Sequence, residues 1–270
     1  MIEILEHGDV RRVRMWTRRS VMIGYDVSAY LVGGLLVDTG FRHVAGDFAR
    51  VLVDLAPRGV VVTHWHEDHA GNAPDVAMSG VPIWMHEFTQ RKLREHEQLK
   101  LYRRVVWGRP VALHGVITPF DPSPLQVIAT PGHSADHHVV WDARTRTLFS
   151  GDLWLGVKVR VLGAEENPYA IIESLRAAIA LEPARMFDAH RGLVANPVEM
   201  LRAKRDWMQN TIGTIEQLLD AGAGESEILN RVLGGDERSA FFSQGEYSRR
   251  NFVRTVARNR ATGSRLPPSG

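Results

Sequence analysis

Imidazole and carboxylate side chains gather in one short segment of the chain, residues 63–72. The segment reads THWHEDHAGN and contains His64, His66, Asp68 and His69. Imidazole nitrogens and carboxylate oxygens are ligands that divalent zinc, iron and manganese accept. Four such ligands in six residues are too many for one catalytic metal, which must keep a coordination position open. The spacing therefore indicates two metal ions side by side rather than a surface loop that happens to be rich in histidine.

An apolar run precedes this cluster directly. Residues 60–62 are three consecutive valines, which is typical of a buried strand. In extended backbone His64 and His66 point to the same side, because side chains alternate along a strand. Asp68 and His69 follow as the chain turns and can reach a second point. We therefore expect the cluster at the place where a strand opens into a loop.

Three later segments each bring one more metal-binding side chain after a strand-like run. They are His133 in TPGHSADH, Asp152 in FSGDLWLG and His190 in FDAHRG. Together with H-x-H-x-D-H after an apolar strand, this order of motifs resembles the metallo-β-lactamase superfamily over roughly residues 20–195. One motif departs from the family pattern, since many relatives read GHG or GHE where this chain has Ala189, His190 and Arg191.

The resemblance implies a fold, a ligand set and a mechanism. The fold is α/β, a four-layer αβ/βα sandwich with the site at one edge. One metal would be held by His64, His66 and His133, the other by Asp68, His69 and His190, with Asp152 bridging. Asp38 would support a ligand rather than bind metal. Two divalent ions, zinc first and iron or manganese as alternatives, would share a water and supply hydroxide at neutral pH. Asp68 would then carry the proton between the attacking water and the leaving group.

The hydrophobic pattern predicts alternating strands and helices around these motifs. Gly33 and Gly34 form a two-residue turn between strands, and Pro57 with Gly59 ends a helix. We expect strands at 2–5, 10–16, 81–85, 125–129 and 184–188, hairpins at 29–37 and 139–150, and helices at 48–55, 73–78, 87–107 and 168–181.

Beyond Arg191 the pattern becomes helical. Asn196 and Pro197 mark a helix start, and further helices are expected at 225–233 and 246–256. We therefore divide the chain into a catalytic domain, 1–195, a helical C-terminal extension, 196–262, and a flexible tail, 263–270. In position the extension resembles the C-terminal part of both glyoxalase-II-like thioesterases and LACTB2-like ribonucleases.

Two groups of basic residues are candidates for substrate contact. Residues 91–109 carry seven Lys or Arg against two Glu, and with the loop 108–124 they are either a solvated helical face or a lid over the site. His96 and His114 lie in this stretch. Lys158 and Arg160 share one face of an extended segment, so they are either substrate-binding cations or surface residues in salt bridges.

Composition narrows the class of protein. The chain has 270 residues, a net charge of +2 and no cysteine, which excludes disulfides, thiolate ligands and a cysteine nucleophile. Without a signal-peptide pattern or an apolar run of membrane-spanning length, we expect a cytoplasmic enzyme with no membrane partner. A homodimer is compatible with the sequence, which does not fix the oligomeric state.

The leading functional hypothesis is a binuclear metallo-hydrolase that cleaves a small ester, thioester or lactone. The alternative is an endoribonuclease of the LACTB2-like type, which THWH, TPGHSADH and the Arg-rich C-terminus favour. The balanced charge argues against nucleic acid as the partner, so a small-molecule substrate is preferred. An iron-dependent persulfide dioxygenase and a β-lactamase are the remaining interpretations of the same fold.

Overall fold

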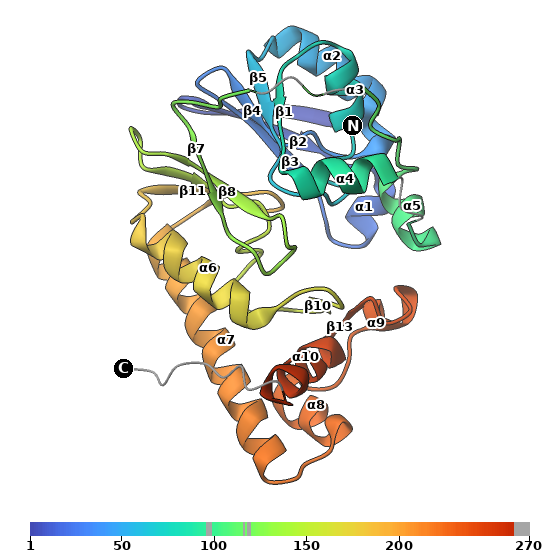
Figure 1. Ribbon diagram of the computed structural model, residues 1–270, viewed down its shortest axis with the longest axis vertical. Coiled ribbons are helices and arrows are strands. Elements are labelled where there is room, and N and C mark those ends of the chain that lie inside the picture. Colours follow the sequence, from blue (N-terminus) through green and yellow to red (C-terminus); the bar gives the residue numbers. More distant parts are fainter. Residues whose placement is uncertain (96–98, 116, 118–119, 262–270) are drawn as a thin grey trace.

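Two β-sheets face each other at the centre of the molecule (Figure 1). The computed structural model describes residues 1–95, 99–115, 117 and 120–261. The first sheet has six strands in sequence order; the first four pair antiparallel and the last two join in parallel. These strands are β1 (Ile2–His7), β2 (Val10–Met15), β3 (Val27–Val32), β4 (Leu35–Val37), β5 (Gly59–Val61) and β6 (Ile83–Trp84).

The second sheet has five strands in the order β12-β11-β9-β8-β7. Only β9 and β11 run parallel, and the other neighbours are antiparallel. The strands are β7 (Gln126–Ala129), β8 (His138–Asp142), β9 (Thr147–Phe149), β11 (Arg185–Asp188) and β12 (Gly192–Val194). The sequence pattern did not predict β12, a three-residue strand that follows His190.

Side chains alternate along the strands, so that one apolar core lies between the two sheets and another lies between the first sheet and its helices. Val61 points between the sheets and packs with Phe149 and Phe187, whose rings stack at 5.6 Å. Its neighbours Val60 and Val62 point to the other face and pack under helices α2 (Ala45–Leu55) and α3 (Ala73–Met78). Because both faces of β5 are buried, its sequence is an unbroken apolar run.

The second sheet is covered on its outer face in the same way. Helices α6 (Pro168–Ala180) and α7 (Pro197–Asp220) pack against it through one continuous apolar cluster. The layers are therefore helix, sheet, sheet and helix, which confirms the predicted αβ/βα sandwich.

The hairpin predicted over 29–37 is present as β3 and β4. Gly33 and Gly34 form its turn with φ of 55° and 77°. Both values lie in the left-handed region, where glycine is the least strained residue.

The single helix predicted over 87–107 is wrong. The structure has two helices there, α4 (Glu87–Glu95) and α5 (Leu101–Trp107). Lys100 interrupts them with an extended backbone, ψ 150°, so α5 starts in a new direction and packs Trp107 against Phe41. The described residues of the following loop, 108–115, 117 and 120–124, contain no helix or strand, as predicted. His96 lies outside the described residues.

The C-terminal part is helical, as predicted. It contains α7, α8 (Glu225–Leu233), α9 (Arg238–Phe242) and α10 (Arg249–Ala261). Before α10 the short strand β13 (Tyr247–Ser248) pairs with β10 (Leu162–Gly163), so the helix predicted from 246 begins later. These helices share their apolar cluster with α6 and the second sheet. The boundary at residue 195 stays a prediction, and the tail 263–270 lies outside the described residues.

Two smaller helical elements complete the described chain. They are α1 (Arg18–Met22), between β2 and β3, and the 3-10 turn η1 (Arg42–Val44), before α2. Within the described ranges, every helix is too short or too polar to cross a lipid bilayer.

Candidate metal centre

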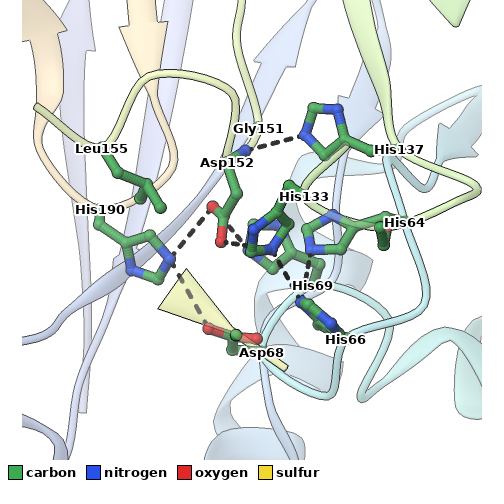
Figure 2. A network of polar contacts seen from close by, with 12 residues as sticks. His64, His66, Asp68, His69, His133, His137, Gly151, Asp152, Leu155 and His190 are labelled. Atoms are coloured by element: carbon green, nitrogen blue, oxygen red, sulfur yellow. Dashed lines mark hydrogen bonds and ion pairs between the residues drawn. The ribbon is translucent and has the colours of Figure 1, made fainter. Parts of the chain in front are cut away.

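The seven side chains predicted to bind metal meet at one edge of the two sheets. They lie in the loops that follow β5, β7, β9 and β11, and Figure 2 shows their side chains turned toward one another. Two groups are formed, one of His64, His66, His133 and Asp152 and the other of Asp68, His69 and His190, with the ligand atoms of each group within 4.8 Å of one another.

Three imidazole nitrogens converge in the first group. His66 Nδ1 lies 3.0 Å from His64 Nε2 and 2.9 Å from His133 Nε2. Two nitrogens bound to one tetrahedral zinc at about 2.0–2.1 Å would lie about 3.3 Å apart. Asp152 Oδ2 adds a fourth atom at 3.3 Å from His133 Nε2. The group therefore has the ligand types and approximate spacing of a tetrahedral metal site.

The second group lies on the other side of the same carboxylate. Asp152 Oδ1 is 3.1 Å from His69 Nε2 and 3.2 Å from His190 Nε2. Asp68 Oδ2 lies 3.6 Å from His190 Nε2. The two oxygens of Asp152 thus face different groups, which is the arrangement that a bridging carboxylate requires.

Two buried polar atoms at the centre test whether a metal fits. His69 Nε2 and Asp152 Oδ1 have no hydrogen-bond partner among the described residues, although they lie 3.1 Å apart. A buried polar group left unsatisfied costs about 1–3 kcal/mol. A divalent cation between the groups would bind both atoms, so the residues present fit a metal pair.

The charges around the histidines favour cations. Burial lowers the pKa of His64 and His66, which keeps their rings neutral and their lone pairs available. Burial also acts to lower the pKa of His190, but the Asp152 and Asp68 carboxylates together outweigh it and raise this pKa to about 9. In the same way, Asp152, Asp38 and Asp68 outweigh burial and raise the pKa of His69. The second group therefore attracts positive charge.

Asp38 contacts the candidate ligand His69. Its Oδ2 lies 2.8 Å from His69 Nδ1, the nitrogen that points away from Asp152. Its Oδ1 accepts hydrogen bonds from the backbone N–H and the hydroxyl of Thr63, at 2.8 and 2.9 Å. This is the contact expected of a supporting carboxylate, because such a partner fixes the ring orientation.

Two side chains that were not predicted as site residues, His137 and Asp188, hold the loop that carries Asp152. The N–H of Asp152 donates to His137 Nε2 at 3.0 Å. Asp188 Oδ2 accepts the N–H of Leu155 at 2.9 Å, while its Oδ1 accepts the N–H of His190 at 2.9 Å. Asp188 stands two residues before His190 in the motif FDAHRG, so its position was the available signal.

A second aspartate inside a recognised motif has a similar role. Asp136, in TPGHSADH, accepts hydrogen bonds from the backbone N–H of Trp65 at 3.0 Å and from the hydroxyls of Thr89 and Ser134 at 2.5 and 2.7 Å. It therefore ties the His133 loop to the loop that carries His64 and His66.

The metal loop is also joined to the basic segment by a buried ion pair. Arg103, in α5, contacts both carboxylate oxygens of Glu67 at 2.5 Å. The same guanidinium contacts Glu246, beside β13, at 2.7 Å. Arg103 and Glu67 are only 7% and 6% exposed. At least one cation of segment 91–109 is therefore a structural link rather than part of a solvated face.

A cavity of about 260 Å³ opens beside the first group. It lies between the metal loop, the basic segment and the C-terminal part. Its walls are Trp65, His66, Leu99, Lys100, Arg103, His133, Gly163, Ala164, Glu165, Glu166, Glu246 and Tyr247.

Lys158 and Arg160 lie outside the walls of this cavity. Lys158 is exposed. The guanidinium of Arg160 lies 3.9 Å from the carboxylate of Glu237. Burial raises the pKa of Tyr25, and the positive charge of Arg160 offsets part of that rise. The ring of Tyr25 contacts His190 edge-on at 5.3 Å, so Arg160 belongs to the surroundings of the second group. A substrate role for either cation stays a prediction.

Comparison with known proteins identifies the family. The model of the metallo-beta-lactamase superfamily matches residues 22–190, which is more than half of the chain. The chain therefore belongs to the metallo-beta-lactamase superfamily, as the motifs predicted.

Two curated relatives illustrate the range within that family. A beta-lactamase-like protein 2 homolog of Caenorhabditis elegans is 30% identical over 64% of this chain and 58% of its own length. The chain thus spans less than two thirds of that relative. An atrochrysone carboxyl ACP thioesterase of Aspergillus chevalieri is 24% identical over 82% of this chain and 80% of its own length.

Solved structures support the fold. A metallo-beta-lactamase family protein from Thermus thermophilus is similar with a TM-score of 0.68 and 20% identity, over 94% of each chain. The DIM-1 metallo-beta-lactamase is similar with a TM-score of 0.60 and 18% identity, over 77% of this chain and 97% of that chain. DIM-1 therefore covers less of this chain than the protein from Thermus thermophilus, which covers nearly all of it.

Proposed function

We propose that the protein is a binuclear metallo-hydrolase that cleaves a small ester, thioester or lactone. The observation that carries this proposal is the position of Asp152, whose two oxygens face two separate groups of ligand atoms. Zinc fits the histidine and aspartate donors, and iron and manganese accept the same ligands. Two divalent ions held there would supply an activated water and polarise the bond to be cleaved.

Different residues of the site would bind the two metal ions and transfer the proton. His64, His66 and His133 would hold one ion and His69 and His190 the other, with Asp68 completing the second group. Asp68 is also the candidate proton carrier, because its carboxylate lies at the edge of the pair, 3.6 Å from His190 Nε2. It would take a proton from the attacking water and return it to the leaving group.

The cavity and one relative support an ester or thioester substrate. A cavity of about 260 Å³ with walls from three parts of the chain suits the end of a small molecule. The relative named as a thioesterase aligns over 82% of this chain, whereas the beta-lactamase-like protein 2 homolog aligns over 64%. The alignment with the thioesterase therefore covers more of this chain.

A panel of substrates tests this function. Metal-loaded protein would be assayed with thioester, ester, lactone, phosphodiester and β-lactam compounds. We expect turnover of a thioester, ester or lactone and loss of that turnover in Asp152→Ala. Turnover confined to phosphodiesters or β-lactams would reject the proposal.

The second candidate is the endoribonuclease inferred from the LACTB2-like motifs. The similarity to the beta-lactamase-like protein 2 homolog favours it. Against it, the Lys and Arg side chains among the described residues of the cavity wall, Lys100 and Arg103, are already paired with glutamates. Phosphate recognition needs cations that are available to the backbone of the nucleic acid.

A further inference from the structure

The cavity beside the first group is where a substituent of the substrate must lie. His66 and His133 contribute to both the metal group and the cavity wall, so the two spaces are continuous. Opposite them, Glu246 and Tyr247 close the cavity from the C-terminal part. If the bond to be cleaved is held at the first group, the substituent on one side of that bond would therefore extend into this cavity.

Lys100 and Arg103, the Lys and Arg side chains that the described residues contribute to the cavity wall, are both paired within the protein. Arg103 is bound by Glu67 and Glu246. The Nζ of Lys100 lies 3.3 Å from Glu246 Oε2 and donates to the carbonyl of Ser243 at 3.2 Å. A carboxylate on the substrate would have to displace one of these glutamates, which have the same charge.

Among the described residues of the wall, carboxylates outnumber the Lys and Arg side chains. Glu165, Glu166 and Glu246 stand against Lys100 and Arg103, a net formal charge of −1 for these five side chains. Glu166 accepts the N–H of Gly163 at 3.1 Å and lies 3.4 Å from His133 Nδ1. Glu165 is exposed and has no ion-pair partner among the described residues.

We propose that this cavity selects a substrate substituent that is neutral or positively charged and rejects one that carries a carboxylate. The proposal rests on the proposed hydrolase function and narrows its substrate class. Like charges placed together at an interface oppose binding, and a protein can use such repulsion to exclude competitors. A cationic end group would instead find Glu165 available at the cavity.

Three thioesters matched in length test the charge preference. The glutaryl, valeryl and trimethylammoniovaleryl esters of one neutral thiol end in a carboxylate, a methyl group and a quaternary ammonium, which cannot attack the thioester. Because they share the reacting bond, the contribution of the metals to cleavage of that bond is similar in all three. We expect kcat/KM to be at least about tenfold lower for the glutaryl ester than for the trimethylammoniovaleryl ester, a difference of about 1.4 kcal/mol. A second series with the same end groups on the thiol covers the opposite orientation.

A charge-reversed pair of variants locates the effect. Glu165→Lys should raise kcat/KM for the carboxylate substrate relative to the ammonium substrate by about tenfold. Asp54→Lys makes the same charge change at an exposed position of helix α2, away from the cavity walls, and should leave the ratio unchanged. Equal ratios in wild type and Glu165→Lys, or a preference for the carboxylate in both series, would overturn the proposal.

The charge preference of the cavity can still be measured if no thioester is cleaved. Failure of all substrates with two metals bound would reject the hydrolase proposal alone. Binding of the corresponding thioethers, measured by calorimetry, would still report the charge preference of the cavity. A carboxylate thioether that binds as tightly as the ammonium one would reject the charge selection.

Discussion

The ammonium group of Lys204 donates a hydrogen bond to the carbonyl of Leu153 at 2.9 Å, one residue after the candidate bridging residue Asp152. It also donates to the carbonyl of Trp154 at 2.5 Å. Lys204 is 4% exposed and comes from α7, in the part of the chain predicted to be an extension. A helix of the C-terminal part therefore holds the loop that carries Asp152.

Replacing Lys204 should loosen this loop. In Lys204→Met the two carbonyls lose their donor, so Asp152 is less well fixed and metal affinity should fall by about 10–100-fold, as for other groups that orient ligands. Titration with zinc against a chelator measures the affinity. Met208→Leu, a conservative change at a buried position of the same helix, is the control. Equal zinc affinity in wild type and Lys204→Met would show that the contact does not position the loop.

Lys204 should also give the stability a distinct pH dependence. Burial lowers its pKa from 10.5 to about 8. Between these values the unfolded chain binds more protons than the folded one, so the free energy of unfolding rises with pH. Across that window wild type should gain about 3 kcal/mol relative to Lys204→Met. Urea unfolding at pH 7.5 and pH 10.5 measures the difference, and a constant difference would contradict the assignment.

Losing Asp152 should be far more damaging than losing Lys158. Asp152→Ala removes a ligand atom from both groups, whereas Lys158 is an exposed residue outside the cavity wall. We expect kcat to fall by more than about a hundredfold in Asp152→Ala, which exceeds the usual loss for a residue that only orients a ligand. Metal content should fall as well. Normal metal content and turnover in Asp152→Ala would reject the bridging role.

The buried pair of Arg103 and Glu67 should contribute strongly to stability when one partner is removed. Arg103→Met leaves the Glu67 carboxylate buried without its cation, and we expect a loss of about 3–5 kcal/mol in unfolding free energy. Arg109→Met, at an exposed position, is the control. The double variant Arg103→Met with Glu67→Leu should recover part of the loss, because no uncompensated charge remains at position 67. A double variant no more stable than Arg103→Met would argue against this explanation.

Salt dependence separates a small substrate from RNA. For single strands, the logarithm of affinity falls with the logarithm of salt concentration by a slope near −0.7 for each phosphate contacted. Because Lys100 and Arg103 are paired within the protein, we expect weak binding of a labelled single-stranded RNA and a shallow slope. Tight, steeply salt-dependent binding together with cleavage would favour the ribonuclease.

The gathering of the seven candidate ligands at one sheet edge was predictable because their signals are local. His64, His66, Asp68 and His69 stand together, and the other ligands follow strand-like runs whose ends meet at one sheet edge. The layered fold followed from the family resemblance. The role of these residues as metal ligands stays a prediction.

The contacts that shape the cavity were not predictable in this way. Arg103 and Glu246 are 143 positions apart, and a basic helix gives no sign of which cation will be buried. Lys204 belongs to no recognisable motif, and although it lies on the buried face of α7 with Leu201 and Met208, a lysine at such a position does not show which group it will contact. The break at Lys100 was missed because periodicity alone does not show where a chain changes direction.

The ionic link of Glu67, Arg103 and Glu246 also bears on the order of folding. Its members come from the first, middle and last parts of the chain, so closing it requires long loops to be ordered first. During synthesis the last candidate metal ligand, His190, and helix α7 emerge before Glu246. We therefore expect the ligand groups to assemble once α7 has docked and the cavity to be completed when the later segment that carries Glu246 docks. A folding intermediate that binds zinc but does not discriminate between substrates would be the signature of this sequence of events.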